Sequence, residues 1–390
     1  MSLCVDVSYK SLNKQGEELC GDKVEVIKTQ DSDIIILADG MGSGVKANIL
    51  ATLTSKILGT MFLKGALIEE CIETIVKTLP ICQVREVAYS TFSILQIFHR
   101  GEAYLVEFDN PRCIFIRDKK LFHAPYKERK IYNKVIKEYR FKPKDRDTFI
   151  LMSDGAIHAG VGKVLNFGWT WESMAEYSVK LCKETNLAAR LATMLCNACD
   201  DLYLHLPGDD TTVIAVNVMK AKEVDLLTGP PLNPKDDDFV VQEFMKKDAK
   251  KIVCGGTSAN IVSRVLKEEI KTSLSYTDSN LPPMGEIKGI DLVTEGVLTL
   301  TKALSLLKRY ADNEVDENFF MELDKDNGGC AIAKTLIEDC TRLNLYVGKA
   351  MNEAHQSTVL PFDLSIRMNL VGQLKEVLIR MGKEVNIKYY

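Results

Sequence analysis

The sequence lacks any run of about 18 apolar residues, the length that a membrane-spanning helix requires. It also lacks the charged segment followed by an apolar one that marks a secretory signal. We therefore expect neither secretion nor membrane spanning, and we expect the protein to be cytoplasmic.

An excess of charge of one sign is also missing. The 50 Lys and Arg residues and 54 Asp and Glu residues leave a formal net charge of -4. Proteins that bind nucleic acid or an anionic membrane as their main role usually carry a strongly basic surface. We therefore expect no nucleic-acid partner and no membrane partner.

The cysteines give no sign of a disulfide framework. There are 11 of them, an odd number, and they are scattered through apolar segments, which suits reduced thiols in a cytoplasmic protein. Cys196 and Cys199 form a C-x-x-C pattern inside a predicted helix, but no second pair follows at zinc spacing. We interpret both as packing residues rather than as metal or redox ligands.

The length of 390 residues predicts two domains, since a compact domain typically holds roughly 100–200 residues. We expect a first domain at 1–220, a linker at 221–238, where prolines and an acidic run stand together, and a second domain at 239–390. The first domain combines many strand patterns with two pairs of amphipathic helices, which predicts an α+β fold with a four-layer α-β-β-α sandwich. The second alternates strands and helices and predicts a smaller α/β domain.

Hydrophobic periodicity predicts the individual elements. In the first domain we expect strands at 3–10, 22–28, 34–37, 147–153 and 213–219, an antiparallel meander at 91–122, and helices at 43–63, 67–79, 170–182 and 187–204. The charged segment 126–146 is a loop or an edge strand, and chiefly a solvated surface. In the second domain we expect strands at 251–254, 344–347 and 384–390, a strand or turn at 289–294, and helices at 258–270, 296–310, 330–343 and 363–381.

Acidic residues stand at the ends of four predicted strands. In chain order they are Asp22, Asp39, Asp154 and the neighbours Asp209 and Asp210. Any one Asp-Gly would more often be an ordinary turn. Four such sites, each attached to a strand, instead favour a cluster of oxygen ligands for Mg²⁺ or Mn²⁺. Two such ions, bridged by one aspartate, would polarise a phosphoryl group and activate a water for in-line hydrolysis.

These motifs together resemble a known family. Gly21-Asp22, ADGMGSG at 38–44, SDG at 153–155 and GDDTT at 208–212 are similar to the ordered motifs of the metal-dependent serine/threonine protein phosphatases of type 2C. The Met-Gly-Ser-Gly turn and the double aspartate resemble the bacterial branch typified by stage II sporulation protein E. The resemblance covers about residues 1–220.

The resemblance implies an α-β-β-α sandwich with a binuclear manganese or magnesium centre. Asp39 would bridge both ions, and Gly40 would give its carbonyl oxygen. Asp22, Asp154 and Asp209 would complete the ligand shells, while Asp210 would hold a water or the turn. A hydroxide bound to the metal would attack the phosphorus of a phosphoserine or phosphothreonine on a small phosphorylated regulatory protein. Asp39 and Asp154 are then the residues on which catalysis depends.

Two positions depart from the eukaryotic members of that family. Met41 stands where they carry a proposed general-acid histidine, and about Glu17 where they carry a phosphate-binding arginine. The leaving oxygen would then take its proton from a metal-bound water, or turnover would be slow. His158 follows the third acid and is more simply a loop histidine. A catalytically weak or silent metal-binding regulator, acting through a partner protein, remains the alternative.

The second domain carries a weaker signal. Gly255, Gly256 and Thr257 open a predicted helix directly after a predicted strand, and could present backbone amides to an anion. The lysine of a P-loop and the G-x-G-x-x-G spacing are missing. A glycine-capped helix start explains the pattern as well as a phosphate or small-ligand site does. We expect this domain to sense a small-molecule ligand or to dock a partner.

Overall fold

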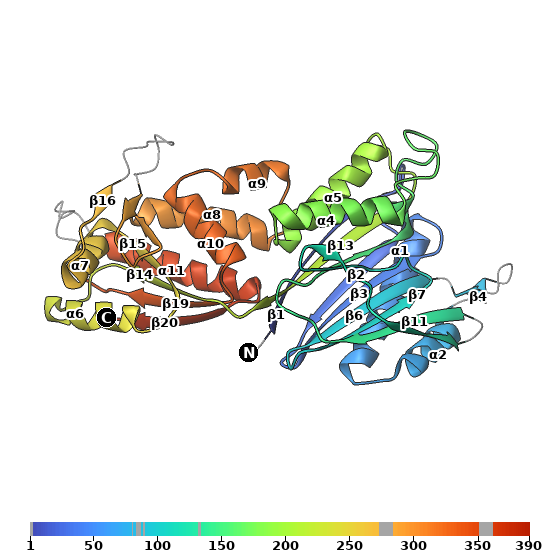
Figure 1. The fold of residues 1–390 in the computed structure, drawn as a ribbon, viewed down its shortest axis with the longest axis horizontal. Coiled ribbons are helices and arrows are strands. Elements are labelled where there is room, and N and C mark those ends of the chain that lie inside the picture. The colour runs from blue at the N-terminus through green and yellow to red at the C-terminus, as the bar shows by residue number, and fades with distance from the viewer. Residues whose placement is uncertain are drawn as a thin grey trace. The chain divides into compact units, whose positions relative to one another are not determined.

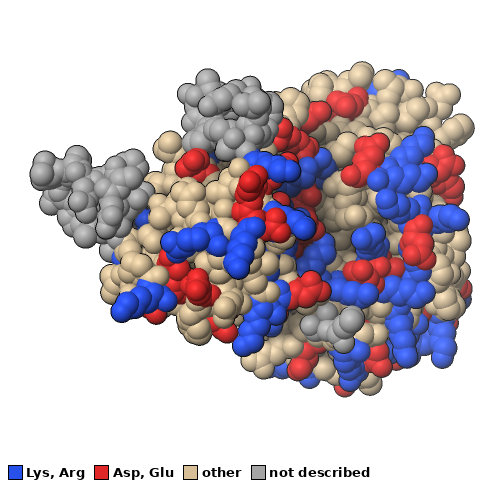
Figure 2. All heavy atoms as spheres, turned by 60° about the vertical axis from the view of Figure 1, so that its left-hand side comes forward, with Lys and Arg blue, Asp and Glu red and all other residues tan. Residues whose placement is uncertain are grey.

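The structure of the protein, a computed structural model, describes residues 3–79, 81–82, 87–88, 90–131, 134–272, 284–350 and 362–390. It contains two compact units, Met1–Lys220 and Ala221–Tyr390 (Figure 1). Within the described ranges, no helix combines the length and the apolar character needed to cross a bilayer. Basic and acidic side chains are interspersed over the face that Figure 2 shows.

The described part of the first unit contains two large antiparallel β-sheets, a small two-stranded sheet, two pairs of helices and one short helix. Its strands are β1 (Leu3–Leu12), β2 (Asp22–Lys28), β3 (Ser32–Gly40), β4 (Ile81–Cys82), β5 (Val87–Ala88), β6 (Ser90–Phe98), β7 (Glu102–Phe108), β8 (Ile114–Arg117), β9 (Lys120–Leu121), β10 (Tyr126–Ile131), β11 (Lys134–Phe141), β12 (Thr148–Met152) and β13 (Thr211–Lys220). Its helices are α1 (Gly44–Leu63), α2 (Ile68–Thr78), α3 (Asp154–Ile157), α4 (Trp171–Glu184) and α5 (Ala188–Leu202). One sheet has the order β1-β13-β12-β8-β9 and the other β10-β11-β7-β6-β3-β2.

The alternation of side chains along each strand divides this unit into layers. In β3, Ile34 and Ile36 pack against the helices α1 and α2, whereas Ile35 and Leu37 pack against the other sheet. The outer face of the five-stranded sheet packs in the same way against α4 and α5. The four-layer α-β-β-α sandwich predicted from the sequence is therefore confirmed.

The charged segment 126–146 forms the edge strand β10 and its neighbour β11, and most of its described residues are exposed or only partly buried, as predicted. The edge strand β10 pairs with β11, and β11 pairs with β7. Ile136 and Tyr139 of β11 are buried. Because alternate residues of a strand face opposite sides, a few apolar residues suffice to attach this charged strand to the sheet.

The second unit is built around a seven-stranded sheet. Its strands are β14 (Glu223–Thr228), β15 (Lys250–Cys254), β16 (Lys271–Thr272), β17 (Gly285–Glu286), β18 (Leu292–Thr294), β19 (Arg342–Val347) and β20 (Glu384–Tyr389). Its helices are a 3-10 turn at Pro234–Asp236, α6 (Asp237–Met245), α7 (Gly256–Leu266), α8 (Val297–Ala311), α9 (Glu317–Leu323), α10 (Gly328–Glu338) and α11 (Phe362–Arg380).

The strand order of this sheet is β16-β17-β18-β15-β14-β19-β20, and the five strands from β18 to β20 in that order are parallel. The chain builds outward from β14 through β15 to β18, and then returns to add β19 and β20 on the other side. The direction of winding therefore reverses between β14 and β19, which makes this position the topological switch point of the sheet.

Residues 221–238 are not a linker, contrary to the prediction. They contain β14, which pairs in parallel with both β15 and β19 and lies inside the sheet. Its Asp225 forms a buried ion pair with Lys251 of β15, at 2.6 Å between Oδ2 and Nζ. The prolines occupy the loop after this strand, and the acidic run forms the first turn of α6, where negative charge is favourable.

Two predicted helices have different limits in the structure. Helix α7 begins at Gly256 rather than 258 and ends before Lys267, which adopts a left-handed conformation with φ of 58°. Helix α10 ends at Glu338 instead of 343, because residues 342–347 join the sheet as β19. Sheet pairing thus overrides a helical pattern at the end of the segment.

Candidate active site

The acidic strand ends of the first unit converge on one cavity of about 200 Å³. Its lining includes Asp39, Gly40, Asp154, Asp209 and Asp210. Asp22 lies directly opposite Asp39 in the pairing of β2 with β3. Side chains at such facing positions of an antiparallel pair are close neighbours. The structure therefore brings together every acid that the sequence places at a strand end.

Glycine residues allow the segments that carry these acids to approach one another. A Cβ atom on Gly40 would lie 2.1 Å from the carbonyl oxygen of Ala47 in α1. A Cβ atom on Gly155 would lie 2.2 Å from the carbonyl oxygen of Asp210, and one on Gly21 would lie 2.7 Å from the Asp210 carboxylate. These separations are far below van der Waals contact, so the glycines beside the acids are required by packing.

Lys14 contacts both acids of the turn that precedes β13. Its backbone amide donates to Asp210 Oδ1 at 3.1 Å. Its ammonium group lies 3.7 Å from Asp209 Oδ1, which also accepts from the Asp210 amide at 3.0 Å. Asp210 is buried, whereas Asp209 is partly exposed beside this lysine. The two neighbours therefore differ in environment, although both line the cavity.

Several carboxylate oxygens in this cluster have no hydrogen-bond partner in the protein. Both side-chain oxygens of Asp22 and the Oδ2 atom of Asp210 are buried and lack a hydrogen bond of good geometry, although the side chains of Ser153 and Thr212 approach Asp22 closely enough to oppose the rise in its pKa. A buried anionic oxygen without a partner is costly. The partner that suits adjacent carboxylates is a cation, and an all-oxygen donor set suits a hard divalent ion. The residues present therefore fit a Mg²⁺ or Mn²⁺ site.

The electrostatic environment of the acids agrees with this fit. Burial, followed by the negative charge of Asp22, raises the pKa of Asp39, and Asp154, Asp209 and Asp210 act in the same direction. Burial is also the main cause that raises the pKa values of Asp22 and Asp154, with repulsion from neighbouring carboxylates adding to it. A bound cation would relieve this repulsion.

The carboxylates surround the cavity without forming a closed coordination sphere. In the part of the chain that the structure describes, no three His, Cys, Asp or Glu side chains are arranged tightly enough to hold a metal ion. The fit of a divalent ion rests instead on the donor chemistry, the unpaired oxygens and the shared negative charge.

The cavity also contains residues that the sequence does not single out. Ser90 and Thr91 of β6 line it, and the Ser90 hydroxyl donates to the Asp39 carbonyl oxygen at 2.9 Å. Asp109, directly after β7, lines it as well and has a φ of 53°. An Asp-Asn-Pro sequence suggests only a turn, but its position at a strand end was a signal that could have identified Asp109.

The positions that depart from the eukaryotic phosphatases have distinct environments. Met41 lines the cavity. Glu17 accepts a hydrogen bond from the Ser43 hydroxyl at 2.9 Å, at the start of α1, where a carboxylate is favoured by the helix dipole. His158 is exposed at the end of α3, outside the cavity lining.

The C-x-x-C pair is part of the helical layer. Cys196 and Cys199 are buried in α5, and Cys199 packs into the apolar core against the five-stranded sheet. Burial raises the pKa of Cys196 to about 12, which disfavours the thiolate form that binds metals. This environment agrees with a packing role.

Gly255, Gly256 and Thr257, the candidate ligand residues of the second unit, line a separate cavity of about 250 Å³. They follow β15 and begin helix α7.

Comparison with known proteins identifies relatives of the first unit. Residues 30–219 match the family model described as stage II sporulation protein E. A search of curated proteins found no match. A solved structure of the phosphatase domain of the cell fate determinant SpoIIE from Bacillus subtilis is 20% identical, covers 56% of this chain and 93% of its own, and has a TM-score of 0.43.

Two other solved structures are similar. A PP2C phosphatase domain of SpoIIE from Bacillus subtilis with a fragment of its regulatory domain is 20% identical, with 56% of this chain and 64% of that chain covered and a TM-score of 0.47. RsbX in complex with magnesium is 19% identical, with 55% of this chain and 95% of that chain covered and a TM-score of 0.40.

Proposed function

We propose that this chain, whose residues 30–219 belong to the stage II sporulation protein E family of serine/threonine protein phosphatases, dephosphorylates a small regulatory protein with the help of two divalent cations. The observation that carries the proposal is the convergence of Asp39, Asp154 and Asp209 on one cavity, with Asp22 facing Asp39 across the strand pair. Carboxylates gathered this closely, of which Asp22 and Asp210 are buried, repel one another, whereas they suit cation-dependent phosphoryl chemistry.

Asp39 is the proposed ligand shared by the two ions. The negative charges of Asp22, Asp154, Asp209 and Asp210 each raise the pKa of Asp39, so it interacts with every other carboxylate of the cluster. Gly40 would give its carbonyl oxygen, and Asp22, Asp154 and Asp209 would complete the two sets of ligands. The Oδ1 atom of Asp210 accepts a hydrogen bond from the Lys14 amide, which suits a role in holding the turn before β13.

When bound, manganese or magnesium ions would polarise the phosphoryl group and lower the pKa of the attacking water. The chain itself would position the phosphoprotein at the cavity, whose lining includes Ser90 and Thr91. Their hydroxyl groups donate to the Asp39 carbonyl oxygen and to Asn110 Oδ1, and so hold this wall of the cavity in place. Met41 has no proton to donate to the leaving serine oxygen, so this proton would come from water in the cavity. We therefore expect slow turnover on phosphoserine and faster hydrolysis of an ester with a better leaving group, such as p-nitrophenyl phosphate.

Divalent cations should raise both the stability and the activity of the protein. A cation that binds only the folded state, present at about 100 times its dissociation constant, raises the free energy of unfolding by about 2.7 kcal/mol. For a unit of this size, that corresponds to a rise in Tm of roughly 5–10 °C. Manganese titrations, followed by differential scanning calorimetry and by hydrolysis of p-nitrophenyl phosphate and a phosphoprotein, measure both effects.

The Asp154→Asn variant is the matched control for this titration, since we expect it to lose both responses. Full activity in excess chelator would contradict the proposed chemistry. A thermal response to manganese without any turnover would instead favour a silent metal-binding regulator.

A further inference from the structure

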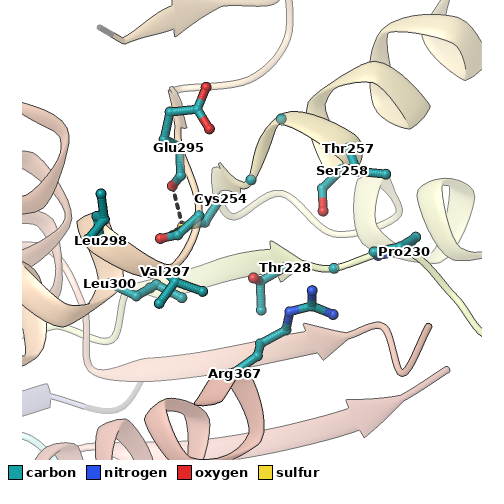
Figure 3. A pocket seen from close by; sticks show the side chains of 14 residues that line it. Thr228, Pro230, Cys254, Thr257, Ser258, Glu295, Val297, Leu298, Leu300 and Arg367 are labelled. Carbon is teal, nitrogen blue, oxygen red and sulfur yellow. Dashed lines mark hydrogen bonds between the residues drawn. The ribbon is translucent and has the colours of Figure 1, made fainter. Parts of the chain in front are cut away.

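A cavity of about 250 Å³ lies at the carboxyl ends of three parallel strands in the second unit. It is lined by residues that follow β14, β15 and β18, together with Arg367 of α11 (Figure 3). In open α/β sheets, ligands bind outside the carboxyl ends of the strands, where the winding reverses. The winding reverses between β14 and β19, and the cavity borders this position, since it begins at the end of β14.

Two helix N-termini meet at this cavity. Helix α7 begins directly after β15 and helix α8 shortly after β18, and neither has a side-chain cap. Their N-cap residues, Gly255 and Gly296, are close neighbours, since a Cβ atom on Gly296 would lie 3.7 Å from the Gly255 Cα atom. The first amides of a helix have no intrahelical acceptor and carry partial positive charge. Two such ends at one cavity favour an anion.

Ser258 provides an independent indication of a ligand. It lies in the first turn of α7, lines the cavity and is only 1% exposed. Its hydroxyl oxygen has no hydrogen-bond partner in the protein, and the side chain points into the cavity in Figure 3. A buried hydroxyl without a partner is costly. This hydroxyl is therefore placed to donate to a bound molecule.

Arg367 brings a buried positive charge to the same cavity. It is 7% exposed, and its Nη1 atom donates to the carbonyl oxygens of Gly348 at 3.1 Å and Ala350 at 3.2 Å. These bonds orient the guanidinium group, which extends past Thr228 in Figure 3. Gly229 leaves room for it, since a Cβ atom there would lie 2.3 Å from Nη1. A planar guanidinium held in this way suits a phosphate group.

The cavity also contains a carboxylate. Glu295 lines it, and its two carboxylate oxygens would lie 3.9 and 3.8 Å from a Cβ atom on Gly256. This carboxylate would repel a bare anion beside it. It would instead accept hydrogen bonds from hydroxyl groups of a larger ligand. Glu295 therefore favours a ligand that combines an anionic group with hydroxyl groups.

We propose that this cavity binds a small phosphate ester that carries hydroxyl groups. The phosphoryl group would lie at the N-termini of α7 and α8, accept a hydrogen bond from Ser258 and pair with Arg367, while the hydroxyl groups would face Glu295. A cavity of about 250 Å³ suits a sugar phosphate or a nucleoside monophosphate rather than a dinucleotide. The proposal is independent of the phosphatase activity of the first unit.

Calorimetric titration of the full chain in excess chelator tests this site, because the metal-free carboxylates of the first unit repel anions. The probes are glucose 6-phosphate, adenosine monophosphate and inorganic phosphate, with glucose and adenosine as unphosphorylated counterparts. We expect one molecule of a phosphate ester to bind per chain, more tightly than inorganic phosphate, and no binding of the counterparts. The preferred ester distinguishes a sugar phosphate from a nucleotide. Failure of both esters to saturate the chain at millimolar concentration would overturn the proposal.

Single substitutions separate this site from adventitious binding. Ser258→Ala should weaken binding of the ester about tenfold, as the loss of one hydrogen bond to a charged group does, and it removes no hydrogen bond within the protein. Ser263→Ala, on the same helix, is the matched control, because its hydroxyl bonds to the Glu268 carbonyl oxygen away from the cavity. Glu295→Gln should tighten binding of inorganic phosphate, since it removes a repelling charge. Unchanged affinity in both Ser258→Ala and Arg367→Lys would overturn the proposal.

Discussion

Asp39→Asn is expected to abolish phosphatase activity while the fold remains intact. Asp39 lies at the end of β3, opposite Asp22, and the negative charges of four other aspartates raise its pKa. Losing the ligand that two cations share should cost at least about 100-fold in turnover, the loss typical of removing one stabilising group from a catalytic site. Hydrolysis of p-nitrophenyl phosphate and of a phosphoprotein with saturating manganese measures this loss.

The same variant should melt at a higher temperature than the wild type when both are metal-free. Burial and neighbouring carboxylates raise the pKa of Asp39 in the folded state. An acid whose pKa is raised on folding destabilises the fold at every pH above its unfolded pKa of about 3.9, and the penalty grows until the folded pKa is reached. Asparagine keeps the shape of the side chain and removes the charge, so the gain in Tm should be present at pH 7 and absent near pH 3.

Asp33→Asn is the matched control, at the other end of the same strand. The Asp33 carboxylate contacts His99 Nε2 at 3.1 Å and lies outside the cavity. We expect this variant to keep its activity and its response to manganese, without any gain in metal-free Tm. A metal-free Asp39→Asn protein that melts below the wild type would show that Asp39 has a structural role instead.

Gly155→Ala is expected to disrupt the site through packing alone. The added Cβ atom would lie 2.2 Å from the Asp210 carbonyl oxygen and 2.5 Å from the Thr211 hydroxyl, so the backbone must move. Overpacking of this kind costs roughly 1–3 kcal/mol, and a displacement of about 1 Å near catalytic groups can cost 100-fold in rate. Thermal melts measure the loss of stability, and turnover on the same preparation measures the loss of rate.

Gly208→Ala is the control in the turn before β13. Its Cβ atom would meet the Tyr203 ring at 3.5 Å, an ordinary contact. We expect activity and Tm close to those of the wild type. If Gly155→Ala behaved in the same way, the close approach of α3 to the Asp209–Asp210 turn would not be needed to hold the acids together.

Local patterns predicted the first unit well, because its layers depend on simple alternation and on amphipathic helices. The segment of β10 was predicted as a loop or an edge strand, but its pairing with a second strand, β11, and the central strand β14 were missed for different reasons. In β11 each face mixes charged and apolar residues, and the buried Ile136 and Tyr139 lie on opposite faces, so no apolar face stands out in the sequence. Residues 221–238 join a buried strand to a proline-rich loop, and the loop composition dominated the interpretation of the whole segment.

The sequence by itself determined which residues could carry the chemistry. An apolar run that ends in Asp-Gly is a local feature, and its recurrence at Asp39 and Asp154 was enough to indicate a cluster of acids. Only the tertiary structure decided that Asp22 faces Asp39, that Asp109 joins the same cavity, and that Ser258 and Arg367 meet at another. These meetings depend on strand register and strand order, which bring together residues far apart in the chain and leave no local pattern behind.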